Sequence, residues 1–405
     1  MNRPQLLFLS QKLAYPPDGG GKIRTFYTLR ELARDFDITA LCFARWKREH
    51  ETRDFDSAVE GLSQFGDVTA IELPQSRSRV RFLFDHTRAL ASGRVYTRYV
   101  YASSHFRKTL AQLLATHQFD VVHSDSLDLS GYFELLSSYP LICAHHDVQS
   151  RLLARRAKHE RSAIRRWYAS LQASAMRKEE EQWCPRVNLN VVVSPEDRAA
   201  FEEIAPTGKY ALFPNGVDID YFQPGEGEGG GIVFVGGTSW FPNLDAWHHF
   251  GQDILPLLRK EDRSPTVTWV GRSTEEQRKH SDSHYGITMT GYVSDVRPYV
   301  LGADCIVVPI RVGGGTRIKI LDAWAMGKAV VSTSVGCEGL NAQDGENILI
   351  RDEPREFAEA IRAVTSDPLL RKRLGENARD TVVTRYSWRS IGEDMRQRYH
   401  SLMTS

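Results

Sequence analysis

Residues 305–333 read CIVVPIRVGGGTRIKILDAWAMGKAVVST, with an apolar run at each end and a glycine-rich turn between them. It opens with CIVVP, an apolar and largely β-branched run that predicts a short buried strand. The segment 318–327 places apolar residues at helical spacing and ends at a glycine, which is a common helix stop. KAVVST, at 328–333, predicts a second strand. A strand, a helix and a strand in this order indicate a parallel sheet covered by helices.

The same alternation extends outward along the chain in both directions. Helical spacing follows the first strand at 22–36 and recurs at 151–187. A Gly/Glu tract at 224–231 separates two similar series of strands. We expect strands at 5–10, 38–44, 68–73, 119–125, 141–147, 190–194, 209–218, 232–237, 266–271, 287–293, 305–309, 328–333 and 347–352.

A chain of 405 residues is long for a single hydrophobic core, so two domains are expected. We place one Rossmann-like domain at 1–213 and a second at 214–380. A helix at about 381–405 is expected to pack back on the first domain. In this α/β architecture the two domains face each other across a cleft, which is where ligands bind.

Composition excludes several classes of protein. The net charge of +1 gives no general attraction to nucleic acid. The five cysteines are scattered and form no C-x-x-C pair, which argues against a disulfide framework or a zinc site. The apolar run after Met1 is too short for a secretory signal, and no stretch reaches the roughly 20 apolar residues of a membrane span. We therefore expect a cytoplasmic protein without a metal site or a nucleic-acid partner.

The glycine-rich turn at the centre of the opening stretch indicates an anion site. Glycines let backbone N–H groups approach a phosphate closely, and the start of a helix adds a favourable dipole. Full positive charges follow within the first turn, although no Walker A lysine is present. The alternative is a tight turn with two exposed cations. The candidate phosphate ligands are Gly313, Gly314, Gly315, Thr316, Arg317 and Lys319.

A second loop, PPDGGGKIRT at 16–25, repeats this composition before the first helix pattern. The alternative is a plain glycine-rich connection. Its candidate residues are Asp18, Gly19, Gly20, Gly21, Lys22 and Arg24.

Further candidates stand where strands end. His145 and His146 follow the strand at 141, and we favour hydrogen bonding to substrate over metal binding for them. The alternative for either histidine is a structural role. The remaining candidates are Asp125, Gly237 and Arg272 at strand ends, Gly291, Tyr292 and Val293 for a base edge, and Asp322 for ribose hydroxyls.

Several of these stretches together resemble one known family. The strongest resemblance runs from 303 to 340, supported by YPPDGGGKIRT, PNGVDIDYF, VFVGGTSWFPNLDA and GYVSDVRPYVLGADCIVVP. The chain resembles the family 4 type retaining glycosyltransferases of GT-B architecture. Within them it is most similar to sugar transferases of exosortase-associated bacterial exopolysaccharide clusters.

The resemblance implies a nucleotide-sugar donor in the C-terminal half and a saccharide or lipid-linked acceptor in the N-terminal half. It implies hexosyl transfer with retention of configuration and without a metal or cofactor. Arg317, Lys319, His145 and His146 would then be the catalytic residues. Asp18, Lys22, Arg24 and Asp125 would meet the acceptor, while the glycine loops and Arg272 would bind the donor phosphates.

The sequence departs from the family pattern at two points. The family places two glutamates eight residues apart, but here the second position is Asp322 and the first falls on Gly314. The arginine and lysine that usually follow VFVGG are missing, and Pro242 and Asn243 stand near the expected lysine. We infer that Arg317 and Lys319 carry the diphosphate charge instead.

Two questions stay open at this level. The basic segment 151–166 is either a solvated helix face or a peripheral contact with anionic lipid on the inner face of the plasma membrane. The alternatives to transfer are a nucleotide-sugar epimerase or a phosphorylase of the same architecture, or a catalytically silent nucleotide-sugar-binding protein.

Overall fold

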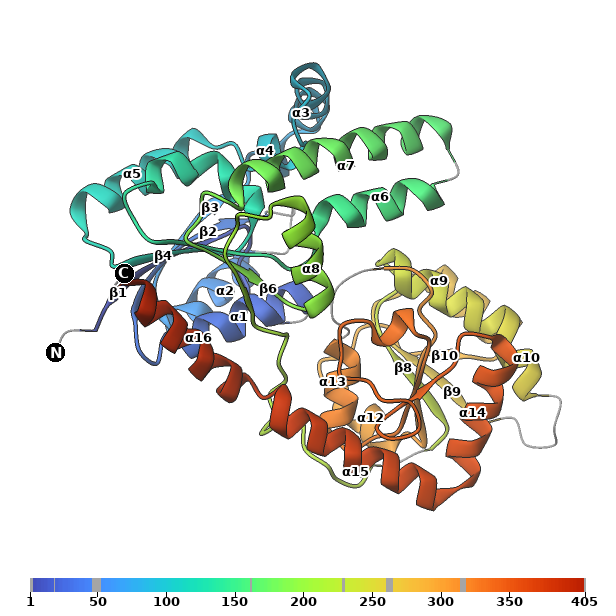
Figure 1. Cartoon of the computed structure of the whole chain (residues 1–405). Helices are drawn as coiled ribbons and strands as arrows, with labels where there is room; N and C mark the ends of the chain where they lie inside the picture. Colours follow the sequence, from blue (N-terminus) through green and yellow to red (C-terminus); the bar gives the residue numbers. More distant parts are fainter. Residues whose placement is uncertain are drawn as a thin grey trace. The chain divides into compact units, whose positions relative to one another are not determined.

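The computed structural model describes residues 3–17, 19–45, 52–160, 162–227, 230–259, 265–313 and 318–403. Figure 1 shows the chain as two compact units with a parallel sheet in each. Unit 1 consists of Met1–Pro214 together with Ile391–Ser405, and unit 2 consists of Asn215–Ser390.

Unit 1 is built on a seven-stranded parallel sheet of order β3-β2-β1-β4-β5-β6-β7. The central strand β1 pairs with β2 on one side and β4 on the other, in register from Leu6 opposite Ile38 and Val121. The central strands are buried on both faces, as parallel strands between two helix layers must be. The strands are β1 Gln5–Ser10, β2 Asp37–Ala44, β3 Gly66–Glu72, β4 Val121–Ser124, β5 Leu141–Ala144, β6 Leu189–Val192 and β7 Tyr210–Leu212.

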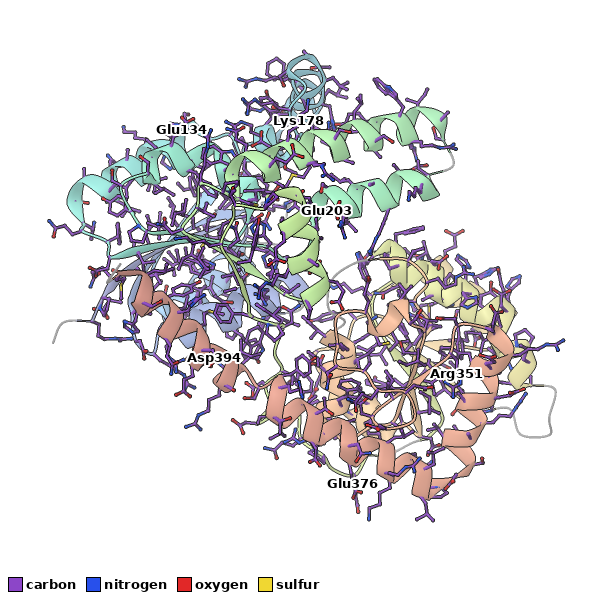
Figure 2. All side chains as sticks on the ribbon, in the orientation of Figure 1. Glu134, Lys178, Glu203, Arg351, Glu376 and Asp394 are labelled. Carbon is purple, nitrogen blue, oxygen red and sulfur yellow. The ribbon has the colours of Figure 1, made fainter. Side chains whose placement is uncertain are left out.

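Helices cover both faces of this sheet, and Figure 2 shows side chains filling the space between the layers. Labelled charged side chains such as Glu134 and Lys178 point away from the sheet. The helices are α1 Gly20–Leu32, α2 Thr52–Ser63, η1 Pro74–Arg77, α3 Arg79–Ser92, α4 Thr97–Val100, α5 Ser104–Thr116, η2 Leu127–Leu136, α6 Gln149–His159, α7 Ala163–Trp183 and α8 Pro195–Ile204.

Unit 2 repeats the plan with a six-stranded parallel sheet of order β10-β9-β8-β11-β12-β13. Among the described residues, its core contains eight buried aromatic side chains, and the Phe234 and Trp269 rings stack at 3.7 Å. The strands are β8 Ile232–Val235, β9 Val267–Val270, β10 Thr288–Met289, β11 Cys305–Val308, β12 Val330–Ser332 and β13 Leu349–Ile350. The helices are α9 Phe241–His249, η3 Phe250–Ile254, α10 Leu255–Leu258, α11 Glu275–His280, η4 Ser281–Tyr285, α12 Arg297–Gly302, α13 Ile318–Ala325, η5 Val335–Cys337, α14 Pro354–Ser366 and α15 Pro368–Arg385.

The last helix, α16 Trp388–Met403, lies against unit 1 for most of its length. Ile391, Met395 and Tyr399 are spaced four residues apart, and all three are buried. Arg396 adds an ion pair to Glu31 on α1 at 3.2 Å. Unit 1 is therefore completed by the C-terminal end of the chain.

Every strand expected from the sequence is present in the described residues, and the α/β class is confirmed. The helical segment expected at 151–187 is confirmed, and it consists of two helices, α6 and α7. They pack on each other as a helical hairpin. Within the described part of the chain, no helix combines the length and apolarity needed to span a bilayer.

Candidate functional site

The end of β8 in unit 2 brings together a cation, an amide and two glycines. Lys319 on α13 donates a hydrogen bond from Nζ to Asn243 Oδ1 on α9 at 2.8 Å. The same ammonium lies 3.9 Å from the centre of the Phe234 ring. The packed ring and the amide fix the position of the charge, which stays partly exposed.

Gly236, directly after β8, allows this approach. A Cβ there would lie 2.6 Å from Asn243 Nδ2 and 2.7 Å from Lys319 Nζ. Its φ of 157° is also one that side chains other than glycine rarely adopt. A larger residue at 236 would therefore push the ammonium away from the strand end.

The neighbouring strands β9 and β10 end beside the same loop. A Cβ on Gly237 would lie 3.1 Å from the Arg272 carbonyl oxygen, so the turns after β8 and β9 touch. The Arg272 guanidinium stands 4.7 Å from the centre of the Tyr292 ring, and Gly291 pairs with Gly271 in an isolated bridge. The structure thus gathers five predicted residues on one sheet edge: Gly237, Arg272, Gly291, Tyr292 and Lys319. Val293, the next residue after Tyr292, packs against the unit 2 core.

Asp322 follows Lys319 by three residues on α13, which is nearly one helical turn. Burial raises the pKa of its carboxyl to about 8. At neutral pH this group is therefore mostly protonated and can donate a hydrogen bond as well as accept one. Ribose hydroxyls, which also donate and accept, suit such a partner.

Part of the predicted site lies outside the described residues. This applies to Gly314, Gly315, Thr316 and Arg317 in unit 2 and to Asp18 in unit 1. Gly313, at the near side of the loop, has a φ of 134°. The roles assigned to these residues stay predictions.

Unit 1 has its own polar cluster where β1 and β4 end. The buried Asp125 carboxylate accepts hydrogen bonds from Thr25 Oγ1 at 2.7 Å and Ser10 Oγ at 3.3 Å. His146 Nε2 lies 3.5 Å from Asp125 Oδ1. Burial alone would raise the Asp125 pKa, but the charge of His146 and the nearby His123 and His146 rings outweigh it and hold that pKa well below its usual range. The group is a fixed anion.

The two predicted histidines have different surroundings. His146 is partly exposed and its Nε2 lies 3.0 Å from the Asp125 carbonyl oxygen. His145 is buried, with Nε2 at 2.9 Å from Asn190 Oδ1 on β6. Burial lowers the His145 pKa to about 4, so its ring is neutral near pH 7. Of the two, His146 is placed to reach a ligand.

Lys12 is a site residue that the sequence did not indicate. It follows β1 by two residues, and a Cβ on Gly21 at the start of α1 would lie 2.6 Å from its Nζ. Its charge acts on three carboxylates, those of Asp125, Asp128 and Asp147. Asp147 Oδ1 is buried without a hydrogen-bond partner, so this cluster retains an unsatisfied acceptor. The position just after a central strand was the available signal.

The predicted residues of the glycine loop in unit 1 differ in how exposed they are. Gly19 precedes α1 in extended backbone, and Gly20 and Gly21 form its first turn. Arg24 is buried, and its Nη2 donates to the Phe213 carbonyl at 3.0 Å. Burial lowers the Arg24 pKa to about 10, which leaves it charged at neutral pH. Lys22 is half-buried on the same helix.

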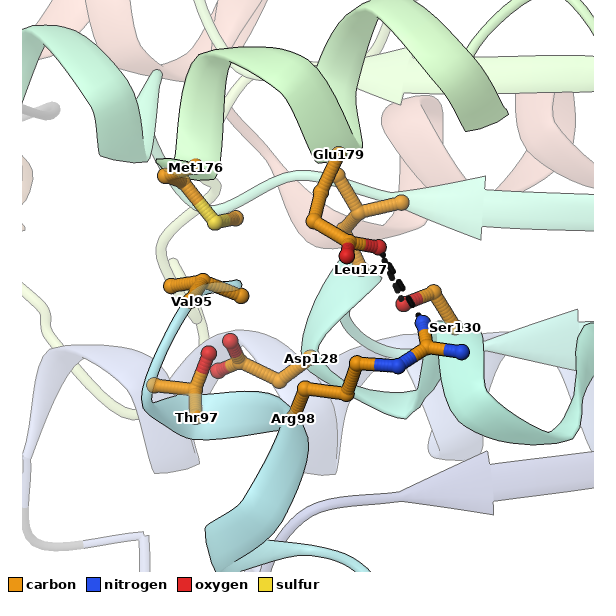
Figure 3. Close-up of a pocket in the computed structure, with 8 residues that line it drawn as sticks. All are labelled: Val95, Thr97, Arg98, Leu127, Asp128, Ser130, Met176 and Glu179. Atoms are coloured by element: carbon orange, nitrogen blue, oxygen red, sulfur yellow. Dashed lines mark hydrogen bonds and ion pairs between the residues drawn. The ribbon is translucent and has the colours of Figure 1, made fainter. Parts of the chain in front are cut away.

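Figure 3 shows a small pocket elsewhere in unit 1, between α4, η2 and α7. Glu179 is its central group and accepts from Ser130 Oγ at 3.3 Å and Arg98 Nη1 at 3.2 Å. Trp183 Nε1 donates to it as well, at 3.2 Å. These partners satisfy the Glu179 carboxylate, which indicates a structural ion-pair network, whereas Thr97 Oγ1 and Asp128 Oδ1 in the same lining are buried without a hydrogen-bond partner. The described residues contain no group of three or more His, Cys, Asp or Glu arranged to hold a metal ion.

Comparisons with known proteins bear on both units. A model described as Glycosyltransferase Family 4 matches residues 18–221, and one described as Glycosyl transferases group 1 matches 229–367. The lipopolysaccharide core biosynthesis glycosyltransferase LpsE of Rhizobium meliloti is 33% identical over 26% of this chain and 31% of that protein. The MMP α-(1→4)-mannosyltransferase of Mycolicibacterium hassiacum is 23% identical over 71% of this chain and 72% of that protein. The matches span 31–40% of the length of the first three curated relatives.

Solved structures agree on the fold. HepE of Anabaena, solved in complex with UDP, has a TM-score of 0.68 at 14% identity and covers 98% of this chain and 100% of its own. WaaG, a glycosyltransferase involved in lipopolysaccharide biosynthesis, has a TM-score of 0.65 at 15% identity over 97% and 99% of the two chains. Together with the two parallel sheets, these likenesses confirm the GT-B architecture. Because one family model alone spans half of the 405 residues and a second covers much of the remainder, this chain belongs to glycosyltransferase family 4.

Proposed function

We propose that this chain is a retaining glycosyltransferase of the hexosyl type. It moves a sugar from a nucleoside-diphosphate donor to a saccharide or lipid-linked acceptor in bacterial exopolysaccharide or cell-surface glycan synthesis. The observation that carries the proposal is the fixed Lys319 ammonium beside the glycine turns after β8 and β9, with Arg272 close by. HepE, which has the same fold, is solved with UDP and with UDP-glucose, which supports a nucleotide-sugar donor.

The chemistry follows from the leaving group. Departure of a nucleoside diphosphate builds negative charge on the oxygen between the sugar and the phosphate. Cations and N–H groups held in place before the reaction stabilise that charge most in the transition state. Lys319 is such a cation, and Asn243 and Phe234 hold its ammonium in place. In this proposal Arg272 and the backbone of Gly237 complete the phosphate site, and Tyr292 and Asp322 meet the nucleoside.

The acceptor site of the proposal is the cluster around Asp125 in unit 1. Asp125 can accept hydrogen bonds from sugar hydroxyls and His146 can donate to them. The Lys12 ammonium suits an acceptor substrate that carries a phosphate group. The donor phosphate can itself take the acceptor proton, so no protein nucleophile is required. No metal or cofactor enters this scheme, because side-chain cations supply the charge.

Two measurements test the function. Thermal unfolding with UDP, GDP, ADP and their sugars should show stabilisation by one nucleotide, by about 2.7 kcal/mol at 100 times its dissociation constant. Release of nucleoside diphosphate should then depend on an added acceptor. Nucleotide binding without any release would instead indicate a silent binding protein, and conversion of the donor without an acceptor would indicate an epimerase.

Lys319→Gln tests whether the Lys319 ammonium takes part in the reaction. Loss of one fixed donor to the developing charge should lower kcat by a factor of about 10² to 10³, or about 2.7–4 kcal/mol of barrier. Lys372→Gln, a highly exposed lysine on α15, is the matched control and should keep wild-type turnover. Equal turnover in both variants, with unchanged unfolding temperatures, would exclude Lys319 from the reaction.

A further inference from the structure

Helix α3 of unit 1 turns its apolar side outward. Val80, Leu83 and Phe84 have 77%, 64% and 55% of their surface exposed, and Leu90 continues the same side of the helix. Ser78 caps the helix by accepting from the Arg81 N–H, and Gly93 ends it in the left-handed conformation. The helix is therefore well defined, while Val80, Leu83 and Phe84 keep more than half of their surface exposed.

The buried residues of α3, among those described, are Asp85 and Ala89, whereas an ordinary surface helix buries its large apolar side chains. Asp85 is fully buried and pairs with Arg81 Nε at 3.0 Å. Gln75 Nε2 donates to Asp85 Oδ2 at 2.6 Å, and Tyr96 Oη donates to Gln75 Oε1 at 2.9 Å. This network fixes the rotation of α3 about its axis. The exposed apolar side is thus specified by the structure.

A second exposed apolar stripe lies on α7. Ile164 and Trp167 are 78% and 57% exposed, and Leu171 extends the stripe by one turn. The two helices are joined by a hydrogen bond between His86 of α3 and Tyr168 of α7. Figure 1 shows α3 standing out from unit 1 beside α7.

The surroundings of these stripes are strongly basic. From Arg151 to Lys178 the sequence carries nine Lys or Arg and one acidic residue, Glu160. On α3 the single carboxylate, Asp85, is already neutralised by Arg81. Exposed Trp, Phe and Leu beside Arg and Lys suit the interface of an anionic bilayer, where apolar side chains enter and cations meet lipid phosphates.

We propose that the outward sides of α3 and of the first half of α7 form a docking surface for anionic lipid bilayers. Val80, Leu83, Phe84, Ile164 and Trp167 insert at the level of the headgroups, and the basic side chains of α6 and α7 contact lipid phosphates. A second copy of the chain is a poorer occupant, because two such faces would bring like charges together. The proposal adds α3 to the contact that the sequence suggested at 151–166 alone.

Vesicle sedimentation with the full chain and no nucleotide tests the surface. Wild type should bind phosphatidylcholine vesicles that contain about 30% phosphatidylglycerol. Its binding to pure phosphatidylcholine vesicles should be weaker by about tenfold or more, and added salt should weaken the binding to the anionic vesicles. Leu83→Ser with Phe84→Ser should weaken the binding by about tenfold or more. Leu369→Ser with Val383→Ser, which changes two exposed apolar residues of α15, is the matched control and should bind like wild type.

Three outcomes would overturn the proposal: no binding by wild type, equal binding by both double variants, or a concentration-dependent dimer that the α3 variant abolishes while vesicle binding is absent. All replaced side chains are exposed, so unfolding temperatures should match wild type and loss of fold is recognised directly. Since no nucleotide is present, failure here leaves the proposed transferase function untouched.

Discussion

Asp322 shares α13 with Lys319, yet its carboxyl is held mostly neutral by burial, with a pKa raised to about 8. Its folded-state pKa lies above that of the unfolded chain, so the native state binds the extra proton. This contribution to stability is fully present below about pH 4 and is lost as pH rises through about 8. The site therefore loses stability as the pH rises from about 4 to about 8.

Asp322→Asn should remove this dependence. The free energy of unfolding of wild type should fall relative to the variant by up to about 3 kcal/mol between pH 5.5 and 8.5. Urea unfolding at the two pH values measures the difference, and other titrating groups cancel between the two proteins. A constant difference across this range would show that the carboxyl is not buried as described.

At the scale of single residues, position after a strand was a usable signal. Gly237 and Arg272 were predicted because they follow strands, and Lys319 because it is a cation at a helix start after a glycine-rich turn; the structure brings the three together. The partners that hold the cation, Asn243 and Phe234, could not be predicted, since they act through packing between elements distant in sequence. For the same reason the sequence did not show that Arg24 is bound by backbone carbonyls.

Among the elements, α16 makes a buried polar contact with the central sheet of unit 1. Tyr399 Oη lies 2.7 Å from His123 Nδ1, and both side chains are buried. His123 in turn lies near Asp125, with 4.0 Å between Nε2 and Oδ1. The C-terminal helix thus supports the strand end that carries the Asp125 cluster.

Tyr399→Phe should leave His123 Nδ1 buried without its partner. The expected loss is about 1–3 kcal/mol in the free energy of unfolding, since the cost is that of an unsatisfied buried polar group. Tyr221→Phe, on a half-exposed ring of unit 2, is the matched control and should change stability by less than about 0.5 kcal/mol. Chemical denaturation measures the free energy of unfolding of both variants. An unchanged value for Tyr399→Phe would argue against a stabilising hydrogen bond between Tyr399 and His123.

Element types were predictable to different degrees. The strands of both sheets were found because apolar β-branched runs between Gly and Pro signals are distinctive. The segment 151–187 was predicted to be helical, but its apolar spacing did not show that it divides into the two helices α6 and α7. For α3, spacing indicates an apolar side without saying which side faces the core, and the buried Asp85 network decides that.

Across the whole molecule, the two units differ in how the chain builds them. The unit 2 core uses residues from Val217 to Tyr386 in one continuous segment. Unit 1 needs both ends of the chain, because Ile391, Met395 and Tyr399 of α16 are buried in it. We therefore expect unit 2 to fold independently and unit 1 to need the C-terminal helix.

A fragment of residues 215–390 should fold on its own and bind the same nucleotide as the full chain, because its core, Lys319 and Arg272 all lie within it. A fragment of residues 1–214 lacks the three buried side chains of α16, each worth about 1.5–3 kcal/mol when fully buried. That loss is comparable to the whole stability of a typical domain, so the fragment should be largely unfolded. Adding the 391–405 peptide should restore part of its structure. Circular dichroism during thermal unfolding tests both fragments, and a cooperative transition for 1–214 alone, at the temperature seen in the full chain, would contradict the role given to α16.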